Sequence, residues 1–292
     1  MFLEPLSESK FLHVLHLFLV KKKKRELMSA APLIHVFVPT RGRYRKRKTI
    51  NELHLLPLSK KGFLKLTVLV PDCEKHEWEE DIPTHVVPDE WRIERIREHI
   101  VNHFTESPIH FVFDDDLIIY RKTGKTTKER ITTEEEIEEF FRHMQGLMES
   151  YGHGGVATNQ NHQFKEIGVY QCERVVFSHF YHRNLLNGLR HTDAPEFEDL
   201  HISLSLIERG ITNGVSYHYV LGSNSNTSGG CSRYRTLETQ NTHASTFHDL
   251  HRGHVTLSKP KYSSVWKGDK ISVRVGWKKA LRDAARSETG KK

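Results

Sequence analysis

The sequence has few cysteines and no long apolar segment at its start. Both features argue against particular classes of protein. Its three cysteines (Cys73, Cys172 and Cys231) are scattered and form no Cys-x-x-Cys pair, which argues against a disulfide framework and a thiolate zinc site. An apolar run at residues 11–20 is too short to span a bilayer. Its lysines follow the run, whereas a secretory signal carries positive charge before it. We therefore expect a cytoplasmic protein that is not inserted in a membrane.

The composition is that of a globular chain with localised positive charge. Of the 292 residues, 37% are hydrophobic and 28% are charged, which suits one α/β domain with a substantial core. The net charge of +7 comes from two short runs, at residues 21–25 and 41–48. Without their eleven cationic residues the remainder would carry about −4 by subtraction. Localised basic segments suit a polyanionic partner, or are simply solvated.

Apolar runs alternate with amphipathic segments from residue 33 onward, without internal repeats. The pattern predicts strands at residues 33–38, 64–70, 84–87, from 109, within 168–181 and at 214–221, and helices at 90–104, 133–151, 198–208 and 236–250. This alternation favours a single α/β domain with a mostly parallel central sheet flanked by helices. We place that domain at residues 28–257, after an extension (1–27) and before a basic tail (258–292) with a short strand and a helix.

Three consecutive acids, Asp114, Asp115 and Asp116, follow the apolar strand that begins at Ile109. Burying unpaired carboxylates is costly, so acids at the end of a core strand indicate a cation, a positive ligand or open solvent. Oxygen ligands two residues apart suit Mg²⁺ or Mn²⁺, often with substrate phosphates. The alternative is a solvated turn. Because ligands bind at the carboxyl ends of parallel strands, residues 39–43, 71–74 and 114–116 are expected along one rim.

Several motifs in this order resemble a known family. Pro-Thr-Arg-Gly-Arg (39–43), the acidic triplet (114–116) and Phe-Glu-Asp (197–199) together resemble a glycosyltransferase of the GT-A type. The downstream run from Ser223 to Gln240, which includes Gly-Gly-Cys-Ser, narrows the resemblance to the TET-associated glycosyltransferases of bacteriophages, relatives of enzymes that glucosylate hydroxymethylated bases in DNA. The similarity spans roughly residues 33–256.

The resemblance implies a divalent ion, Mn²⁺ or Mg²⁺, that stabilises the departing nucleoside diphosphate. Asp116 is expected as the direct ligand, and Asp114 as a contact to the ribose or, through water, to the metal. Asp115 is placed in the donor site, with an inward-facing bond to backbone as the alternative. The other residues expected around a UDP-sugar donor are Pro39, Thr40, Arg41, Arg43 and Glu74. For Glu74, a plain loop acid is the alternative.

Glu198 and Asp199 open a predicted helix, where acids are often only caps or N-terminal charges. By resemblance, Asp199 is the general base that takes the proton of the acceptor hydroxyl, and Glu198 is its positioning neighbour. The residues expected at the acceptor or its phosphates are Gly229, Gly230, Arg233 and Arg235.

The sequence contains 21 histidines, most of which are expected to be ordinary surface or core residues. His99 and His103 are spaced i, i+4 on a helix, a spacing that can hold zinc, but the Glu of an HExxH motif is missing. A late histidine often completes the metal shell in GT-A enzymes, which makes His254, or alternatively His251, the candidate ligand.

The predicted function is therefore transfer of a hexose from a nucleotide sugar to 5-hydroxymethylpyrimidine in phage DNA, with 5-hydroxymethylcytosine favoured and inversion at the sugar. One rival is a metal-dependent nuclease or phosphotransferase that acts on nucleic acid. A second keeps the GT-A fold but uses a glycan or protein acceptor. A third is a DNA-binding module without catalysis.

Overall fold

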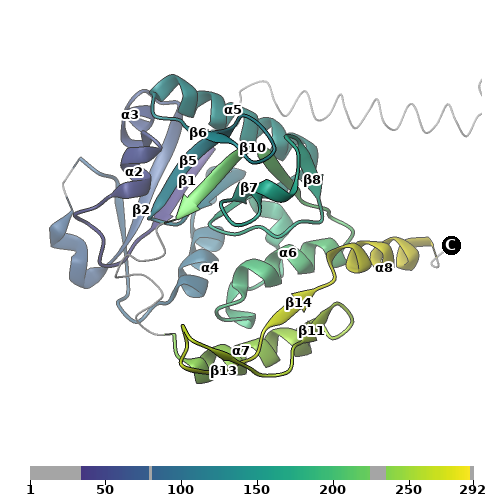
Figure 1. Ribbon diagram of the computed structural model, residues 1–292. Coiled ribbons are helices and arrows are strands. Elements are labelled where there is room, and N and C mark those ends of the chain that lie inside the picture. The colour runs from purple at the N-terminus through teal and green to yellow at the C-terminus, as the bar shows by residue number, and fades with distance from the viewer. Residues whose placement is uncertain (1–33, 79–80, 224–234, 290–292) are drawn as a thin grey trace, which may run out of the picture. The chain divides into compact units, whose positions relative to one another are not determined.

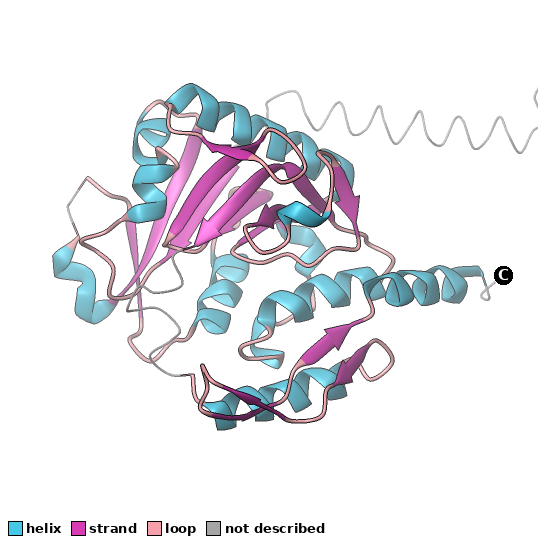
Figure 2. Cartoon of the chain, in the orientation of Figure 1, coloured by secondary structure: helices cyan, strands magenta, loops and turns pink. Residues whose placement is uncertain are grey.

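The computed structural model describes residues 34–78, 81–223 and 235–289, and within them ten strands form one central sheet (Figures 1 and 2). The strands are β1 (Ile34–Pro39), β2 (Leu64–Pro71), β3 (Thr84–Val87), β4 (Ile109–Phe113), β5 (Leu117–Lys122), β6 (Lys128–Arg130), β7 (His153–Thr158), β8 (Val169–Gln171), β9 (Ser178–His182) and β10 (Gly214–Ser223). Their order is β3-β2-β1-β4-β9-β7-β10-β5-β6, and β8 pairs with β10.

The sheet is mixed, with most strands running in one direction. Strand β1 pairs in parallel with both β2 and β4, β2 pairs in parallel with β3, and β7 pairs in parallel with β10. The remaining pairs, which involve β5, β6, β8 and β9, are antiparallel. Together with the helices on both faces, this arrangement confirms the predicted α/β class and the mostly parallel central sheet.

Helices cover both faces of the sheet. They are α2 (Lys48–Glu52), α3 (Leu55–Lys60), α4 (Ile93–His103), α5 (Glu134–Tyr151), α6 (Glu198–Glu208), α7 (Leu237–Leu250) and α8 (Trp277–Thr289). One core cluster joins the sheet to α2, α3 and α5, and a second joins it to α4 and α6 (Figure 1). Since β1 and β2 are buried almost throughout, they need the near-continuous apolar runs seen in the sequence.

Helix α5 shows how closely local sequence sets the boundaries of an element. Thr133 accepts a hydrogen bond from the backbone N–H of Glu136, whose side chain bonds back to the N–H of Thr133, completing a capping box. At the other end Gly152 has φ of 73°, a left-handed conformation that glycine adopts without strain. The helix therefore begins and ends where the sequence predicts.

The C-terminal residues pack against α6 as a further layer. Two short antiparallel sheets of two strands form there, β11 (Val255–Leu257) with β14 (Val273–Val275) and β12 (Lys261–Ser263) with β13 (Gly268–Lys270). A third apolar cluster joins α6, α7, β11 and α8. No helix among the described residues is both long and apolar enough to cross a membrane. The expected N-terminal extension, with its basic run at residues 21–25, lies outside the described residues.

Candidate functional site

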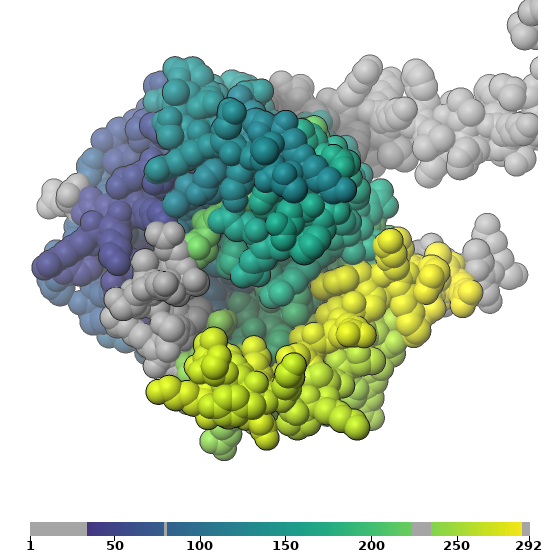
Figure 3. All heavy atoms as spheres, in the orientation of Figure 1, coloured from purple at the N-terminus to yellow at the C-terminus, as the bar shows by residue number. Residues whose placement is uncertain are grey.

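A cavity of about 620 Å³ lies at the carboxyl ends of β1 and β4. Its walls come from the loop after β1, the start of α4, the start of α6 and the C-terminal segment 266–277. Figure 3 shows the surface hollowed between the teal residues of the sheet and the yellow C-terminal residues. The predicted site residues that line it are Pro39, Thr40, Arg41, Arg43, Asp114, Asp115, Asp116, Glu198, Asp199 and Arg235.

The turn that carries the three acids is fixed by Thr49 of α2. The Thr49 hydroxyl donates to the backbone oxygen of Asp114 (2.6 Å) and accepts from the N–H of Leu117 (2.9 Å). The N–H of Asp114 donates to the carbonyl of Phe177 (2.9 Å), just before β9. Because backbone bonds hold both ends of the turn, Asp114 and Asp116 are kept at the cavity wall.

Asp115 is tied to the loop after β1. Its carboxylate accepts a hydrogen bond from the Thr40 hydroxyl (2.7 Å) and forms an ion pair with Arg43. Burial raises the pKa of Asp115, and these two partners oppose that rise. Asp115 thus lines the cavity with the other two acids, and the partners of its carboxylate are side chains rather than the backbone groups of the alternative. Asp115 joins β4 to β1 across the rim.

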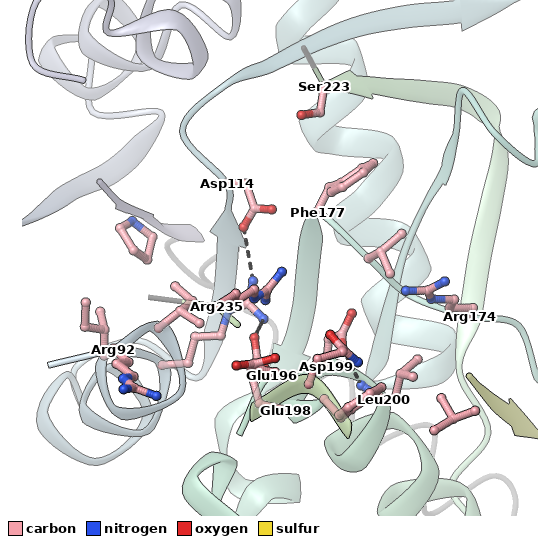
Figure 4. Close-up of a pocket in the computed structure, with 18 of the residues that line it drawn as sticks. Arg92, Asp114, Arg174, Phe177, Glu196, Glu198, Asp199, Leu200, Ser223 and Arg235 are labelled. Carbon is pink, nitrogen blue, oxygen red and sulfur yellow. Dashed lines mark hydrogen bonds and ion pairs between the residues drawn. The ribbon is translucent and has the colours of Figure 1, made fainter. Parts of the chain in front are cut away.

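Arg97 of α4 joins the two acidic groups of the cavity, and it was not among the residues predicted from the sequence. Its two terminal nitrogens donate to Oε1 of Glu198 (2.8 Å) and to Oδ1 of Asp114 (3.1 Å). In Figure 4, dashed lines mark these two interactions at Asp114 and at Glu198. The side chains of Arg97 and Glu198 are 7% and 5% exposed, so their ion pair is well shielded from water.

Burial and the mutual proximity of the acids shift their proton affinities. Burial raises the pKa of Asp114 to about 6; Arg97 opposes the rise, and the charges of Asp115, Asp116 and Asp199 add to it. Burial likewise raises the pKa of Glu198, against the opposing charge of Arg97. The pKa of Asp114 and of Glu198 stays raised although Arg97 contacts both acids, and a divalent cation bound beside them would favour their charged forms.

The acids at the end of β4 suit a divalent cation of the hard type. Asp114, Asp115 and Asp116 all line the cavity. Asp115 is held by Thr40 and Arg43, and the same Arg43 lies 3.5 Å from a carboxylate oxygen of Asp116. Among the described residues these acids do not form a preassembled group of three ligands. Two carboxylates are sufficient for Mg²⁺ or Mn²⁺, because such ions commonly take further ligands from water and substrate phosphates.

Asp199 occupies the first turn of α6 and lines the cavity beside Glu198 (Figure 4). One of its carboxylate oxygens accepts the N–H of Leu200 (2.7 Å). Negative charge is favoured at a helix N-terminus, where backbone N–H groups lack intrahelical partners. Glu198 is fixed by Arg97, so Asp199 is the acid of this pair that is placed to meet a ligand.

Positive side chains and aromatic rings surround the acids. In addition to Arg41, Arg43, Arg97 and Arg235, the cavity is lined by Arg92, Arg174 and Lys270, none of which was predicted. Figure 4 shows that Arg92, Arg174 and Arg235 lie around the acids from different elements. The aromatic residues in the wall are Trp91, Phe177, Phe197, Trp266 and Trp277. Such a lining suits a ligand with both phosphate groups and flat rings.

Two residues in the cavity wall have left-handed backbones although neither is glycine. Phe177 has φ of 67° and Glu196 has φ of 62°. This conformation is uncommon for a bulky residue, and residues held in it often cluster at functional sites. The Phe177 carbonyl accepts the N–H of Asp114, and the Glu196 carboxylate accepts the Thr239 hydroxyl (3.0 Å). Both residues therefore support the surroundings of the acids.

Glu74 does not line the cavity. Its carboxylate oxygens lie 2.8 and 2.7 Å from the backbone N–H of Gly42, which donates to them. Gly42 has φ of 71°, a conformation suited to glycine. Glu74, which follows β2, thus holds the loop that follows β1. The two segments lie on the same rim of the sheet, as expected from the sequence.

His254 does not line the cavity that holds the acidic triplet, so this arrangement does not support its predicted role as a metal ligand with Asp116. Its Nδ1 and Nε2 atoms are 2.7 Å from Glu208 and 3.2 Å from Asp283. Glu208 ends α6, whose first turn holds Asp199, about 14 Å away along the helix axis. The alternative, His251, contacts the same Glu208 (2.9 Å). Gly229, Gly230 and Arg233 lie outside the described residues.

These features define an α/β protein with an acidic, arginine-lined cavity at the carboxyl ends of parallel strands, where such sheets bind ligands. Residues 34–230 match the TET-associated glycosyltransferase family, and they make up about two thirds of the chain. The chain belongs to this family and is a glycosyltransferase, so the resemblance found in the sequence is confirmed. The alternative function, a metal-dependent nuclease or phosphotransferase, is not supported.

Several solved structures are similar to the chain at low identity. Glucosyl-3-phosphoglycerate synthase of M. tuberculosis has 13% identity, with 85% of this chain and 92% of that chain covered and a TM-score of 0.49. A mycobacterial protein has 10% identity, 84% coverage of each chain and a TM-score of 0.48. Residues 1–349 of S. aureus TarS, in complex with UDP-GlcNAc, have 14% identity, 74% and 67% coverage and a TM-score of 0.45. No curated protein matches the sequence.

Proposed function

We propose that this glycosyltransferase transfers a sugar from a nucleotide sugar to the hydroxyl of a 5-hydroxymethylpyrimidine in DNA, using Mn²⁺ or Mg²⁺. 5-Hydroxymethylcytosine is the favoured acceptor and a UDP-sugar the favoured donor. One observation carries the proposal: Asp114 and Asp116 from β4 and Asp199 from α6 line the same cavity, although they are far apart in the sequence. A metal-dependent sugar transferase that acts by direct displacement needs both acidic functions at one reacting centre.

The donor is assigned to the side of the cavity formed by β1 and β4. Asp116 and Asp114 provide oxygen ligands, and a divalent ion held there would neutralise charge that develops on the leaving diphosphate. Arg41 and Arg43 lie in the same wall and can donate to phosphate oxygens in pairs. A volume of about 620 Å³ is adequate for a ligand of nucleotide size.

The acceptor is assigned to the side of the cavity formed by α6. As the acceptor oxygen attacks the anomeric carbon, the bond between that carbon and the diphosphate breaks, and Asp199 takes the hydroxyl proton. A primary alcohol is too weak an acid to ionise alone near neutral pH, so direct displacement requires such a base. Arg97 keeps Glu198, the neighbour of Asp199, in a fixed position. Displacement in one step inverts the configuration of the sugar.

The DNA acceptor is supported by the family resemblance and by charge next to the cavity. Arg45 and Lys46 are exposed and follow the cavity residue Arg43 in the same loop. Exposed cations of this kind attract the phosphate backbone. The hydroxymethyl group would enter either from the major groove or after the base has rotated out of the stack.

The test incubates the protein with Mn²⁺, a panel of nucleotide sugars and DNA that contains hydroxymethylcytosine, hydroxymethyluracil or unmodified bases. Mass spectrometry of the digested nucleosides should show one added sugar on a hydroxymethylated base only. No added mass with any donor would refute the DNA acceptor. Transfer to a glycan or protein in the same panel would instead support the second rival.

The Asp199→Asn variant tests the assigned base. We expect the transfer rate to fall by about 10²–10⁴, while the affinities for Mn²⁺ and the donor remain near those of the wild type. The exposed Asp193, just before α6, provides a matched control, Asp193→Asn, that should keep wild-type activity. An active Asp199→Asn variant would show that another group takes the proton.

A further inference from the structure

A cluster of three histidines lies outside the cavity, on the far edge of the sheet. His85 belongs to the edge strand β3, and His99 and His103 belong to α4, which packs beside it. Each of the three offers a ring nitrogen, and these nitrogens all lie within 4.8 Å of one another. His99 and His103, which are spaced i, i+4 in the sequence, are thus joined by His85 from a different element.

The separations within this histidine cluster are close to those of a metal site. Two nitrogens that are each 2.0–2.1 Å from a tetrahedral zinc ion lie roughly 3.3 Å apart. The Nε2 atoms of His85 and His99 are 3.0 Å apart. The ring centroids of His99 and His103 are 4.6 Å apart, and those of His85 and His103 are 5.0 Å apart. His99 is stacked with both His85 and His103, at interplanar angles of 26° and 18°, so the rings must turn for their nitrogens to converge on one ion.

The surroundings keep two of the three imidazoles neutral, as metal binding requires. Burial lowers the pKa of His99 to about 4, and the neighbouring imidazoles His85 and His103 lower it further. Burial and His103 lower the pKa of His85 as well. Trp91 and Phe104 pack against the rings and limit their movement, with centroids 5.0 Å from His99 and 5.1 Å from His85.

We propose that His85, His99 and His103 bind one transition-metal ion such as Zn²⁺ and thereby fasten the edge strand β3 to helix α4. Imidazole nitrogens favour zinc and similar ions over Mg²⁺ or Mn²⁺, which prefer oxygen ligands, so this site and the carboxylates of the cavity select different metals. His103 is exposed, which leaves room for water as a fourth ligand.

The proposed ion would act on the helix that carries Arg97. Arg97 lies two residues before His99, on the buried side of α4, and joins Asp114 to Glu198. An ion that fixes α4 to β3 therefore also stabilises the position of Arg97. This role is structural and does not depend on the acceptor or the donor of the transferase.

The test uses the full chain without a histidine tag, freed of metal by a chelator and kept in excess Mg²⁺ so that the carboxylates are occupied. Titration calorimetry with Zn²⁺ should give one ion per chain, and bound zinc should raise the melting temperature by several degrees. His99→Asn and His103→Asn should bind zinc at least about tenfold more weakly and lose this increase. Without metal, their melting temperatures should stay close to that of the wild type.

Two controls separate this site from other sources of zinc binding. His76→Asn removes an exposed histidine that lies outside the cluster, and Asp116→Asn removes the assigned metal ligand of the cavity. Both should bind zinc like the wild type. Equal zinc binding by wild type, His99→Asn and His103→Asn would overturn the proposal. So would loss of zinc binding in Asp116→Asn alone.

Discussion

Asp114 at the end of β4 and Glu198 at the start of α6 accept hydrogen bonds from the same guanidinium group, that of Arg97. Arg97 thereby joins the strand that carries the assigned metal ligands to the helix that carries the assigned base. The buried guanidinium group of Arg97 therefore fixes the donor side of the cavity relative to the acceptor side. Each acid keeps a raised pKa in spite of this partner, because burial penalises its charged form.

Replacing Arg97 should therefore destabilise the fold and abolish activity together. Arg97→Met keeps the length of the side chain but leaves the carboxylates of Asp114 and Glu198 without their shared cation. We expect a loss of about 3 kcal/mol in the free energy of unfolding at pH 8. The loss should shrink at pH 5, where both acids can take up protons. Chemical denaturation at the two pH values measures the difference.

The control for Arg97 is Arg95→Met on the exposed side of the same helix. Arg95 lies over the ring of Trp91 at 5.3 Å, a contact that contributes at most about 1 kcal/mol at an exposed site. A loss of stability in Arg97→Met that is no larger than in Arg95→Met would show that the bridge is not a structural necessity.

Adjacent acids in the triplet should fail in different ways when they are changed to amides. Asp116→Asn should lower the affinity for Mn²⁺ at least about tenfold and reduce turnover strongly, with a smaller loss of stability than Asp115→Asn, because the contact of Asp116 with Arg43 is the longer one, at 3.5 Å. Asp115→Asn should lose about 1–3 kcal/mol of stability, because the charge that holds Thr40 and Arg43 is gone. Metal titrations and thermal melting, run on both variants, measure the contrast. The same Mn²⁺ affinity in Asp116→Asn and wild type would contradict the assignment.

The sequence predicts those elements whose apolar pattern is regular. Strands β1, β2 and β4 are short buried runs, and α5 carries its own capping box, so local signals and tertiary contacts agree. Strand β7 is not among the strands that the sequence predicts, because Gly154 and Gly155 interrupt its apolar pattern. The reason for these glycines is packing: a Cβ on Gly154 would lie 2.1 Å from the Gly214 carbonyl oxygen.

Helices α2 and α3 were not predicted because their starts lack the usual signals. Arg47 and His54 precede them in the left-handed conformation, with φ of 40° and 46°, and neither side chain caps its helix. Their positions come from the tertiary contacts of residues such as Leu53 and Leu58, which are fully buried. The role of Thr49, which lies in α2 and fixes the acidic turn, could therefore not be predicted from local sequence either.

The rim with its acids was predictable, since the carboxyl ends of parallel strands meet there. Arg97 was missed, although its position gives a signal. It lies on the same helical stripe as Ile93, Ile100 and Val101, and a charged residue on the apolar side of a helix needs a buried partner. The contribution of residues 266–277 to the cavity depends on how the two small C-terminal sheets, β11-β14 and β12-β13, pack on the rest of the protein. No local sequence pattern predicts that packing.

The raised pKa of Asp114 predicts how metal binding depends on pH. A carboxyl group must lose its proton to bind a cation, so the dissociation constant for Mn²⁺ should rise as the pH falls through about 6. At Asp114, the folded protein also binds more protons than the unfolded chain between about pH 4 and 6. The contribution of Asp114 to stability is therefore greatest at low pH and is lost as the pH rises through this window. Binding titrations from pH 5 to 8 measure the first effect.

Asp114→Asn should flatten both dependences, because the amide has no proton to lose. Its Mn²⁺ affinity should be lower than that of the wild type at pH 8, with a weaker change toward pH 5. A wild-type pH profile in this variant would assign the titration to another group, such as Glu198, whose pKa is also raised by burial.

The basic loop after β1 should contribute to DNA affinity without taking part in the chemistry. Arg45 and Lys46 are exposed, and changing both to Gln should reduce the slope of log affinity against log salt concentration by about 1.8 if each contacts one phosphate of a duplex. Fluorescence anisotropy with labelled DNA at several salt concentrations gives the slope. Lys60→Gln/Lys61→Gln is the matched control, since it removes the same charge from lysines that are paired with Asp81 and Glu134. Equal slopes for the two double variants would mean that net charge alone attracts DNA and that this loop does not contact it.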